Sequence, residues 1–180
     1  MPRRLAALLV FVIGLAPFTA AAAELTTNAE GLFTQPWFKA STGDLRQDLK
    51  QAQAEGKILA VLWEQKGCGY CRMMHSVNFQ VEEHVAYYKD KFHVVQMNLW
   101  GEHDVIDMDG SKMAQADMAS KYRVTGTPMT LFFKPDGEVA FLLPGYADPP
   151  IFKDVFVYVE TRGYETATIR EWFKQRNSGG

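Results

Sequence analysis

The two cysteines of the 180-residue chain, Cys68 and Cys71, stand three positions apart with Gly69 and Tyr70 between them. Cysteines this close can form a redox-active disulfide, half of a metal site, an attachment point for haem or a small structural disulfide. Haem attachment requires a histidine directly after the second cysteine, and residue 72 is arginine. A structural disulfide across so short a loop adds little stability through chain entropy. A redox pair and a metal site are the two readings left to compare.

A zinc site would need four ligands, and the cysteines supply two of them. His75 lies four residues after Cys71 and therefore on the same helical face, but a fourth ligand would have to come from His84, His93 or His103. That spacing matches no known zinc motif. We therefore expect no metal and no other cofactor. A module that uses its dithiol to carry copper(I) or zinc is the alternative from a different functional class.

The redox reading has a direct physical basis. A Cys-x-x-Cys motif between a strand and a helix places the first sulfur at the helix N-terminus, where free N–H groups and the helix dipole favour a thiolate. Cys68 would then be the nucleophile, and Cys71, one turn further on and less exposed, the resolving thiol. Lys66 and Arg72 add positive potential nearby, and Gly69 leaves the approach to Cys68 open.

The elements that must position this motif alternate between helices and strands. Apolar runs predict strands at 57–65, 91–100, 128–134 and 138–145, the last two joined by a Pro-Asp-Gly turn. Helices are predicted at 44–56 with Asp44 as N-cap, from the cysteine motif to about 90 with a looser stretch towards Asn78, at 112–124, and from 148 to 175 with a break near Gly163. A polar loop is expected at 101–112. The order predicts an α/β domain with a mixed sheet.

The N-terminus predicts export. Arg3 and Arg4 precede an apolar run at 5–18, and small residues follow up to Ala23, as in a signal peptide cleaved after residue 23. Residues 24–43 then form an irregular lead-in, and residues 44–180 form the domain. Export to an oxidising compartment, here the bacterial periplasm, allows a cysteine pair to cycle. The chain has 21 acidic and 19 basic residues and no basic stripe, so we expect no nucleic-acid partner.

The stretches KILAVLWEQKGCGYC and YRVTGTPMTLFF, at 57–71 and 122–133, resemble the thioredoxin superfamily. The resemblance implies a thioredoxin fold, with a central mixed sheet flanked by helices, to which this chain adds its lead-in and an inserted loop-helix. It also implies a cis-proline at Thr127–Pro128 beside the disulfide. A substrate segment would pair with the backbone of Thr127 as a short added strand.

A narrower resemblance covers about 44–172 and rests on WEQKGCGYCRMMH, VVQMNLWG, DMDG and KYRVTGTPMTLFF. These stretches are similar to the exported thioredoxin-like proteins of bacterial sulfur-oxidation (Sox) systems, the SoxW type. That resemblance implies a reductase that receives electrons from a membrane thiol transporter. It would pass them to periplasmic protein disulfides, such as one on a sulfur-carrier protein.

Two features near the motif bear on its chemistry. Thioredoxins have a buried aspartate six residues before the first cysteine, and here that position is Leu62. Glu64 lies on the same strand face and would replace it as proton acceptor if buried; a solvated glutamate at the strand end is the alternative. Trp63, Tyr70 and Met129 are expected to form an apolar collar around Cys68.

The sequence therefore predicts a periplasmic thiol–disulfide oxidoreductase that works as a reductase and is a monomer. The motif CGYC also resembles that of periplasmic disulfide isomerases, so an isomerase or oxidase is the alternative within the same class. Those isomerases carry a separate dimerisation domain, which residues 24–43 are too few to supply.

Overall fold

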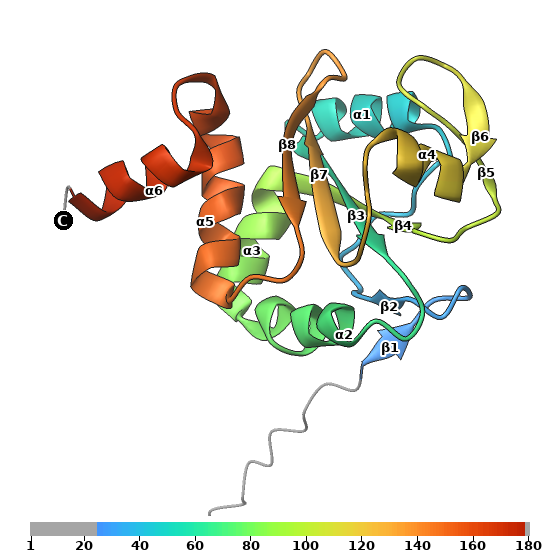
Figure 1. The fold of residues 1–180 in the computed structure, drawn as a ribbon, viewed down its shortest axis with the longest axis horizontal. Coiled ribbons are helices and arrows are strands. Elements are labelled where there is room, and N and C mark those ends of the chain that lie inside the picture. The colour runs from blue at the N-terminus through green and yellow to red at the C-terminus, as the bar shows by residue number, and fades with distance from the viewer. Residues whose placement is uncertain (1–24, 179–180) are drawn as a thin grey trace, which may run out of the picture.

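The centre of the molecule is a four-stranded mixed sheet. The computed structural model describes residues 25–178, and the predicted signal peptide at 1–23 lies outside them. The sheet has the order β4-β3-β7-β8, with β3 and β4 parallel and the other neighbours antiparallel (Figure 1). Its strands are β3 (Ile58–Glu64), β4 (Phe92–Asn98), β7 (Met129–Phe133) and β8 (Val139–Pro144). The predicted α/β fold with a central mixed sheet is confirmed.

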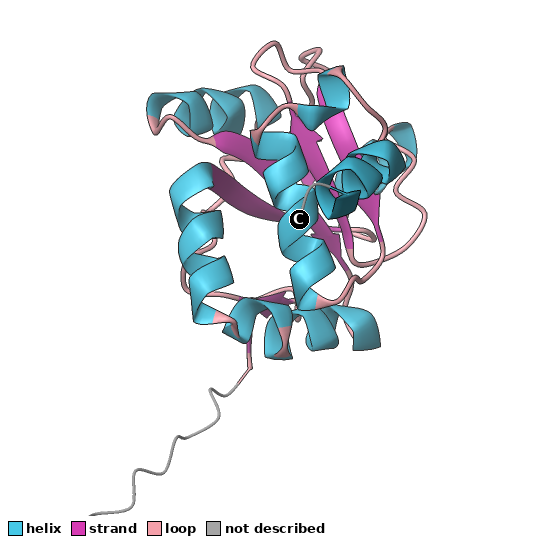
Figure 2. Ribbon diagram, turned by 90° about the vertical axis from the view of Figure 1, so that its left-hand side faces the viewer, coloured by secondary structure: helices cyan, strands magenta, loops and turns pink. Residues whose placement is uncertain are grey.

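Helices cover both faces of this sheet (Figures 1 and 2). One face packs against α1 (Leu45–Ala54) and α4 (Gln115–Lys121). The other packs against α2 (Gly69–Ser76), α3 (Glu82–Lys91) and α5 (Pro149–Glu160). The last helix, α6 (Ile169–Ser178), follows α5 and places no fully buried residue in the core.

The β3 strand divides its side chains between these two layers. Leu59, Val61 and Trp63 belong to the cluster under α1 and α4, whereas Ala60 and Leu62 belong to the cluster under α2, α3 and α5. Successive side chains of a strand point to opposite faces, so a strand covered on both sides reads as a continuous apolar run. This explains why the sequence indicates a buried central strand at this position.

Local signals fix two helix boundaries where the sequence predicts them. The side chain of Asp44 accepts a hydrogen bond from the Arg46 N–H at 2.9 Å and caps α1. The closing helix breaks near Gly163, where a short 3-10 turn, η2 (Gly163–Glu165), separates α5 from α6. A Cβ atom at residue 163 would lie 2.5 Å from the Tyr158 ring, so this close approach requires glycine.

The helix predicted from the motif onwards is divided in two, at the stretch expected to be looser. Its first part, α2, starts at Gly69, directly after the N-cap Cys68, and ends at Ser76. A 3-10 turn, η1 (Asn78–Gln80), then leads into the separate helix α3. The buried side chain of Asn78 donates to the Ala147 carbonyl at 2.9 Å and ties the break to the β8–α5 connection.

Two segments predicted as irregular contain short strands. In the lead-in, β1 (Thr26–Thr27) pairs with β2 (Phe33–Thr34), and in the expected polar loop, β5 (Asp104–Ile106) pairs with β6 (Lys112–Ala114). Strands of two or three residues are too short to show a period of two, so sequence patterns miss them. Among residues 25–178, no helix combines the length and apolar character needed to cross a membrane.

Candidate functional site

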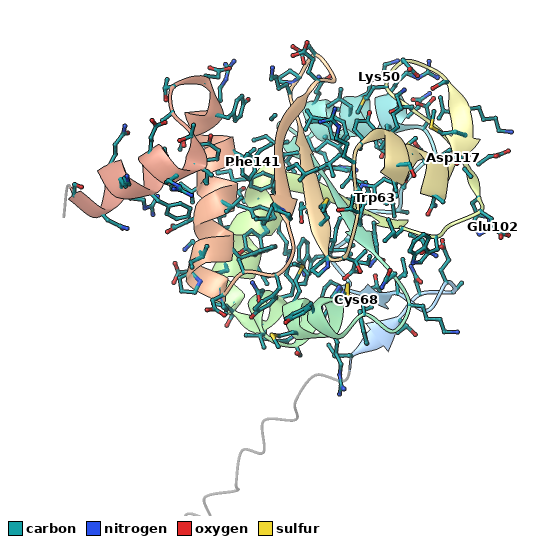
Figure 3. All side chains as sticks on the ribbon, viewed as in Figure 1. Lys50, Trp63, Cys68, Glu102, Asp117 and Phe141 are labelled. Atoms are coloured by element: carbon teal, nitrogen blue, oxygen red, sulfur yellow. A yellow bond between two sulfur atoms is a disulfide. The ribbon has the colours of Figure 1, made fainter. Side chains whose placement is uncertain are left out.

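Cys68 and Cys71 form a disulfide at the junction between β3 and α2 (Figure 3). Cys68 is the N-cap of α2, and its sulfur accepts a hydrogen bond from the Cys71 N–H at 3.0 Å. Cys68 is 7% exposed, whereas Cys71 is fully buried. Of the two cysteines, the one at the helix N-terminus thus retains a small exposed area, whereas the other retains none.

The loop before β7 lies beside this disulfide. The Thr127–Pro128 peptide bond is cis, and the Thr127 carbonyl oxygen lies 3.6 Å from the Cys68 sulfur. Thr127 is half-buried, and its hydroxyl has no hydrogen-bond partner within the described residues. A polar backbone group therefore faces the sulfur that an incoming disulfide would meet.

The expected apolar collar has different members. Trp63 is 1% exposed and pairs with Met129 across β3 and β7, and both side chains belong to the core cluster under α1 and α4. The prediction for Trp63 as a substrate contact is wrong, because its indole points into the layer under α1 and α4. Met129 is also buried.

Other exposed apolar side chains flank the disulfide. Tyr70 is 61% exposed and stacks on Tyr146, with ring centroids 6.2 Å apart. Burial and the nearby negative charge of Asp148 raise the pKa of Tyr146, so its ring stays neutral. Met73 and Val77 continue the exposed apolar line along α2, at the three- and four-residue spacing of one helix face. Tyr146 could not be found from sequence, because only the fold brings β8 to the start of α2.

Glu64 is fully buried, so the alternative of a solvated glutamate at the strand end is wrong. Its carboxylate lies 3.1 and 3.3 Å from Nε2 of His75, and it accepts a short hydrogen bond from the side-chain amide of Gln96. Within residues 25–178, its ion-pair contact is with His75 alone. A buried carboxylate requires such partners, because an unpaired charge in the interior is very unfavourable.

His75 was not singled out by the sequence for a redox role, although it shares a helix face with Cys71. It is fully buried in α2, and its Nδ1 atom lies 3.2 Å from Nε2 of Gln35 in the lead-in. The rings of Phe33 and Phe38, also in the lead-in, pack against the imidazole at centroid distances of 5.9 and 5.6 Å. The spacing of four residues from Cys71 was the available signal.

The lead-in thus covers the Glu64–His75 pair and closes one edge of the sheet. Gln96 of β4 donates to the Phe33 carbonyl at 2.5 Å, and the Lys39 N–H donates to the Val94 carbonyl at 2.8 Å. Figure 1 shows β1 and β2 next to α2, at the end of the sheet that carries the disulfide. The segment that the sequence indicated only as irregular is therefore part of the site.

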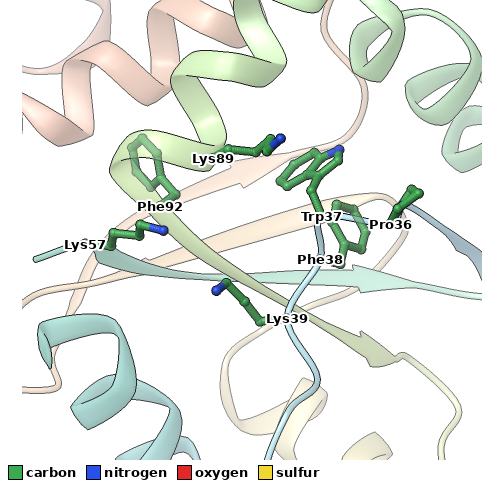
Figure 4. A pocket seen from close by; sticks show the side chains of 7 residues that line it. All are labelled: Pro36, Trp37, Phe38, Lys39, Lys57, Lys89 and Phe92. Carbon is green, nitrogen blue, oxygen red and sulfur yellow. The ribbon is translucent and has the colours of Figure 1, made fainter. Parts of the chain in front are cut away.

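A separate cavity of about 270 Å³ lies near the start of β3, at the opposite end of this strand from Cys68 (Figure 4). It is lined by aromatic and lysine side chains and one proline: Pro36, Trp37, Phe38, Lys39, Lys57, Lys89 and Phe92. Hydrogen bonds from Lys57 and Lys39 hold the pKa of Glu55 at about 2, against the opposing effect of burial.

Among residues 25–178, no cluster of three or more His, Cys, Asp or Glu side chains could hold a metal ion.

The sequence matches the family described as Thioredoxin-like domain over residues 45–160, well over half of the chain. The chain therefore belongs to this thioredoxin-like family. The matched region contains the disulfide, Glu64, His75 and the cis-proline, but the lead-in lies outside it. No curated protein matches the chain at a significant level.

Solved structures with the same fold are distant in sequence. A thioredoxin-fold protein from Helicobacter pylori is 22% identical with a TM-score of 0.57, and the match covers 68% of this chain and 81% of that one. A thioredoxin from Thermus thermophilus is 22% identical with a TM-score of 0.53, covering 68% and 86%. A Bacteroides thetaiotaomicron protein is 24% identical with a TM-score of 0.56, covering 79% and 100%. These likenesses establish the thioredoxin fold.

Proposed function

We propose that this protein is a thiol–disulfide oxidoreductase that reduces disulfides in other proteins. The observation that carries the proposal is the arrangement of the two sulfurs. Cys68 lies at the N-terminus of α2, is 7% exposed and faces the Thr127 carbonyl, whereas Cys71 is fully buried. A helix N-terminus favours the thiolate form that attacks disulfides.

The reaction has two thiol–disulfide exchanges. The Cys68 thiolate attacks one sulfur of the substrate disulfide, forms a mixed disulfide and releases the other substrate sulfur as a thiolate. Cys71 loses its proton and attacks Cys68, which releases the second substrate thiolate and restores the Cys68–Cys71 disulfide. The substrate gains two electrons, and the protein loses them.

Substrate binding would use the surface around Cys68. The backbone of Thr127, next to Pro128, pairs with an extended substrate segment. Gly69 leaves space above the sulfur, and Tyr70 with Tyr146 offers an aromatic surface to apolar residues that flank the substrate disulfide. Met129 and Trp63, which are buried, would support this substrate-binding surface from the core.

Glu64 is the proposed proton acceptor for Cys71. It ends β3 on the face that carries Leu62, where thioredoxins have their buried aspartate, and its full burial meets the condition set for that role. A buried carboxylate near a reacting thiol can hold the proton while the thiolate attacks.

The setting of the reaction follows from the sequence. We assign the protein to the periplasm from its predicted signal peptide, as a monomer, with reduction supplied by a membrane thiol-electron transporter. The resemblance to sulfur-oxidation proteins favours a sulfur-carrier protein as substrate. Neither exchange requires a cofactor or a nucleic acid.

Two cysteine variants test the mechanism. Cys71→Ser should accumulate mixed disulfides with substrate proteins through Cys68, which are seen as mass shifts that dithiothreitol reverses. Cys68→Ser should neither trap substrates nor reduce insulin. Trapping by Cys68→Ser, or no trapping by Cys71→Ser, would contradict the assigned roles.

The midpoint potential of the disulfide decides between the reductase and the alternative in the same class. A value near that of thioredoxin, about −270 mV, supports a reductase. A value of about −120 to −180 mV supports an oxidase or isomerase, because it means that the reduced form is strongly stabilised. Stoichiometric copper or zinc in the purified protein, without disulfide reductase activity, would favour the metal-carrier alternative.

A further inference from the structure

The contacts of the Glu64–His75 pair define which atoms carry its protons. The side-chain Nε2 of Gln35 lies 3.2 Å from Nδ1 of His75 and 3.5 Å from the His75 carbonyl oxygen. An amide nitrogen is a donor, so Nδ1 accepts and the imidazole proton sits on Nε2. From there it is donated to the Glu64 carboxylate at 3.1 Å. Nε2 of His75 is thus the donor in this contact, and the Glu64 carboxylate is the acceptor.

Gln96 holds the carboxylate from the other side. Its Nε2 donates both to Glu64 and to the Phe33 carbonyl, while its Oε1 accepts from Asn28 at 3.2 Å. The orientation of this amide is fixed by the Phe33 carbonyl, which can only accept, and by Asn28, whose own oxygen accepts from the Glu30 and Leu32 N–H groups. Two N–H donors, from His75 and Gln96, stabilise the charged form of Glu64.

Among residues 25–178, no Lys or Arg side chain forms an ion pair with Glu64. Its surroundings in the lead-in, η1 and β4 are Phe33, Gln35, Phe38, Phe79 and Gln96. Of the charged residues in adjoining segments, Arg72 is on the exposed face of α2, Lys66 lies against Gly31, and Glu30 accepts from Asn98. Proton transfer in the buried region around this pair therefore involves Glu64, His75 and Cys71.

Cys71 and His75 are four residues apart in α2, a spacing that brings their Cβ atoms to within about 6 Å. A thiolate on Cys71 and a carboxylate on Glu64 would place two negative charges in one buried region, which is strongly unfavourable. The buried region can keep a single negative charge if the Cys71 proton moves to Glu64 as the thiolate forms. This transfer requires that Glu64 be unprotonated beforehand.

We propose that His75 is the positioning residue that orients the Glu64 carboxylate as a proton acceptor, and that Gln35 of the lead-in holds His75 in the Nε2–H form needed for this. The inference rests on the proposed function, since it concerns how Cys71 is activated. It adds a residue of α2 and a residue outside the matched family region to the redox site. Without the His75 N–H, the Glu64 carboxylate would lose the donor that orients it to accept the proton from Cys71.

The reaction of the reduced protein with the aromatic disulfide DTNB separates the two steps. Attack by Cys68 releases one coloured thiophenolate, and attack by Cys71 on the mixed disulfide releases the second, so stopped-flow absorbance gives one rate for each cysteine. We would compare Glu64→Gln, His75→Phe, His75→Gln and Gln35→Leu with the wild type across pH. His84→Gln, a half-buried histidine on α3, is the matched control.

We expect the second phase at neutral pH to slow about tenfold or more in Glu64→Gln and His75→Phe, the size of a lost proton acceptor. It should recover as the pH rises and solvent ionises Cys71. Gln35→Leu should show a smaller shift in the same direction. In His75→Gln, whose amide can still donate to Glu64, the rate of the second phase should stay within about threefold of the wild-type rate. In the control His84→Gln, this rate should equal that of the wild type.

Three results would overturn the inference. These are an unchanged second phase in Glu64→Gln and His75→Phe, an equal loss of both phases at every pH, or equal loss in His75→Gln and His75→Phe. Nitrogen-15 NMR of the wild-type imidazole provides a readout that needs no variant, and a proton on Nδ1 at neutral pH would also overturn it. An absent first phase in the wild type would instead refute the proposed function.

Discussion

The position of Cys68 predicts how reactive its sulfur is in the reduced protein. Its sulfur accepts the Cys71 N–H at 3.0 Å and caps an eight-residue helix. A negative charge at a helix N-terminus is stabilised by about 0.3–1 kcal/mol. A hydrogen bond to a charged acceptor exceeds a neutral one by about 1–1.5 kcal/mol. Together these terms give about 1.5–2.5 kcal/mol in favour of the thiolate.

At about 1.4 kcal/mol per unit, this stabilisation shifts the ionisation of Cys68 by about one to two pH units. Partial burial opposes the shift, since desolvation disfavours the charged form, so we expect the lower half of this range. The alkylation rate of Cys68 by iodoacetamide should therefore rise to its plateau about one pH unit below the value for a free cysteine.

The assay uses the single-thiol variant Cys71→Ala, which keeps the backbone N–H that bonds to Cys68. Its alkylation rate is measured against pH in the native state and again in denaturant, where the helix is absent. The midpoint should be lower in the native state. Equal midpoints, or a higher native one, would refute the argument that the N-terminus of α2 activates this sulfur.

Two further predictions concern the surface and the acid stability of the protein. Tyr146→Ala, which removes the ring stacked on Tyr70, should slow insulin reduction several-fold and leave the DTNB reaction unchanged. Tyr146→Phe should retain the wild-type rate in both assays. A loss of rate in both assays for Tyr146→Ala would show a structural effect instead. The pKa of Glu55 is depressed to about 2 in the folded state, chiefly by Lys57, so its stabilisation is present above its ordinary pKa of 4.5 and is lost as the pH falls towards 2. Glu55→Gln should therefore lower the thermal midpoint at pH 7 but have a smaller effect near pH 3, and an equal effect at both would contradict the charge argument.

The parts of this molecule that sequence could predict are those specified by local pattern. The apolar run at 57–65 gives β3, and Asp44 gives the cap of α1, because their signals lie within a few residues. The motif and its adjoining strand likewise place Cys68 at a helix start. Long-range contacts gave no such signal. Trp63 sits next to the motif in sequence, yet the pleat of β3 turns it into the core.

The burial of Glu64 depended on a segment that sequence patterns describe poorly. Two-residue strands and a few aromatic residues place the lead-in over α2, and Asn28 meets Gln96 from 68 positions away. Whether a glutamate at a strand end is buried depends on the segment that covers it, and the sequence of this segment has no hydrophobic periodicity. Both alternatives for Glu64 were therefore equally consistent with the sequence.

The covering of the Glu64–His75 pair by the lead-in also makes the pair and its cover depend on one another. Under the cover, a lone Glu64 would be a buried charge without its histidine donor, and a lone His75 would lose its acceptor. Loss of the cover would expose both side chains to water and remove the reason for retaining them. Introducing Glu64, His75 or the cover alone is therefore costly or neutral, and each is favourable only together with the other two. Among related chains, we expect Gln35, Glu64 and His75 to be inherited or replaced as a set.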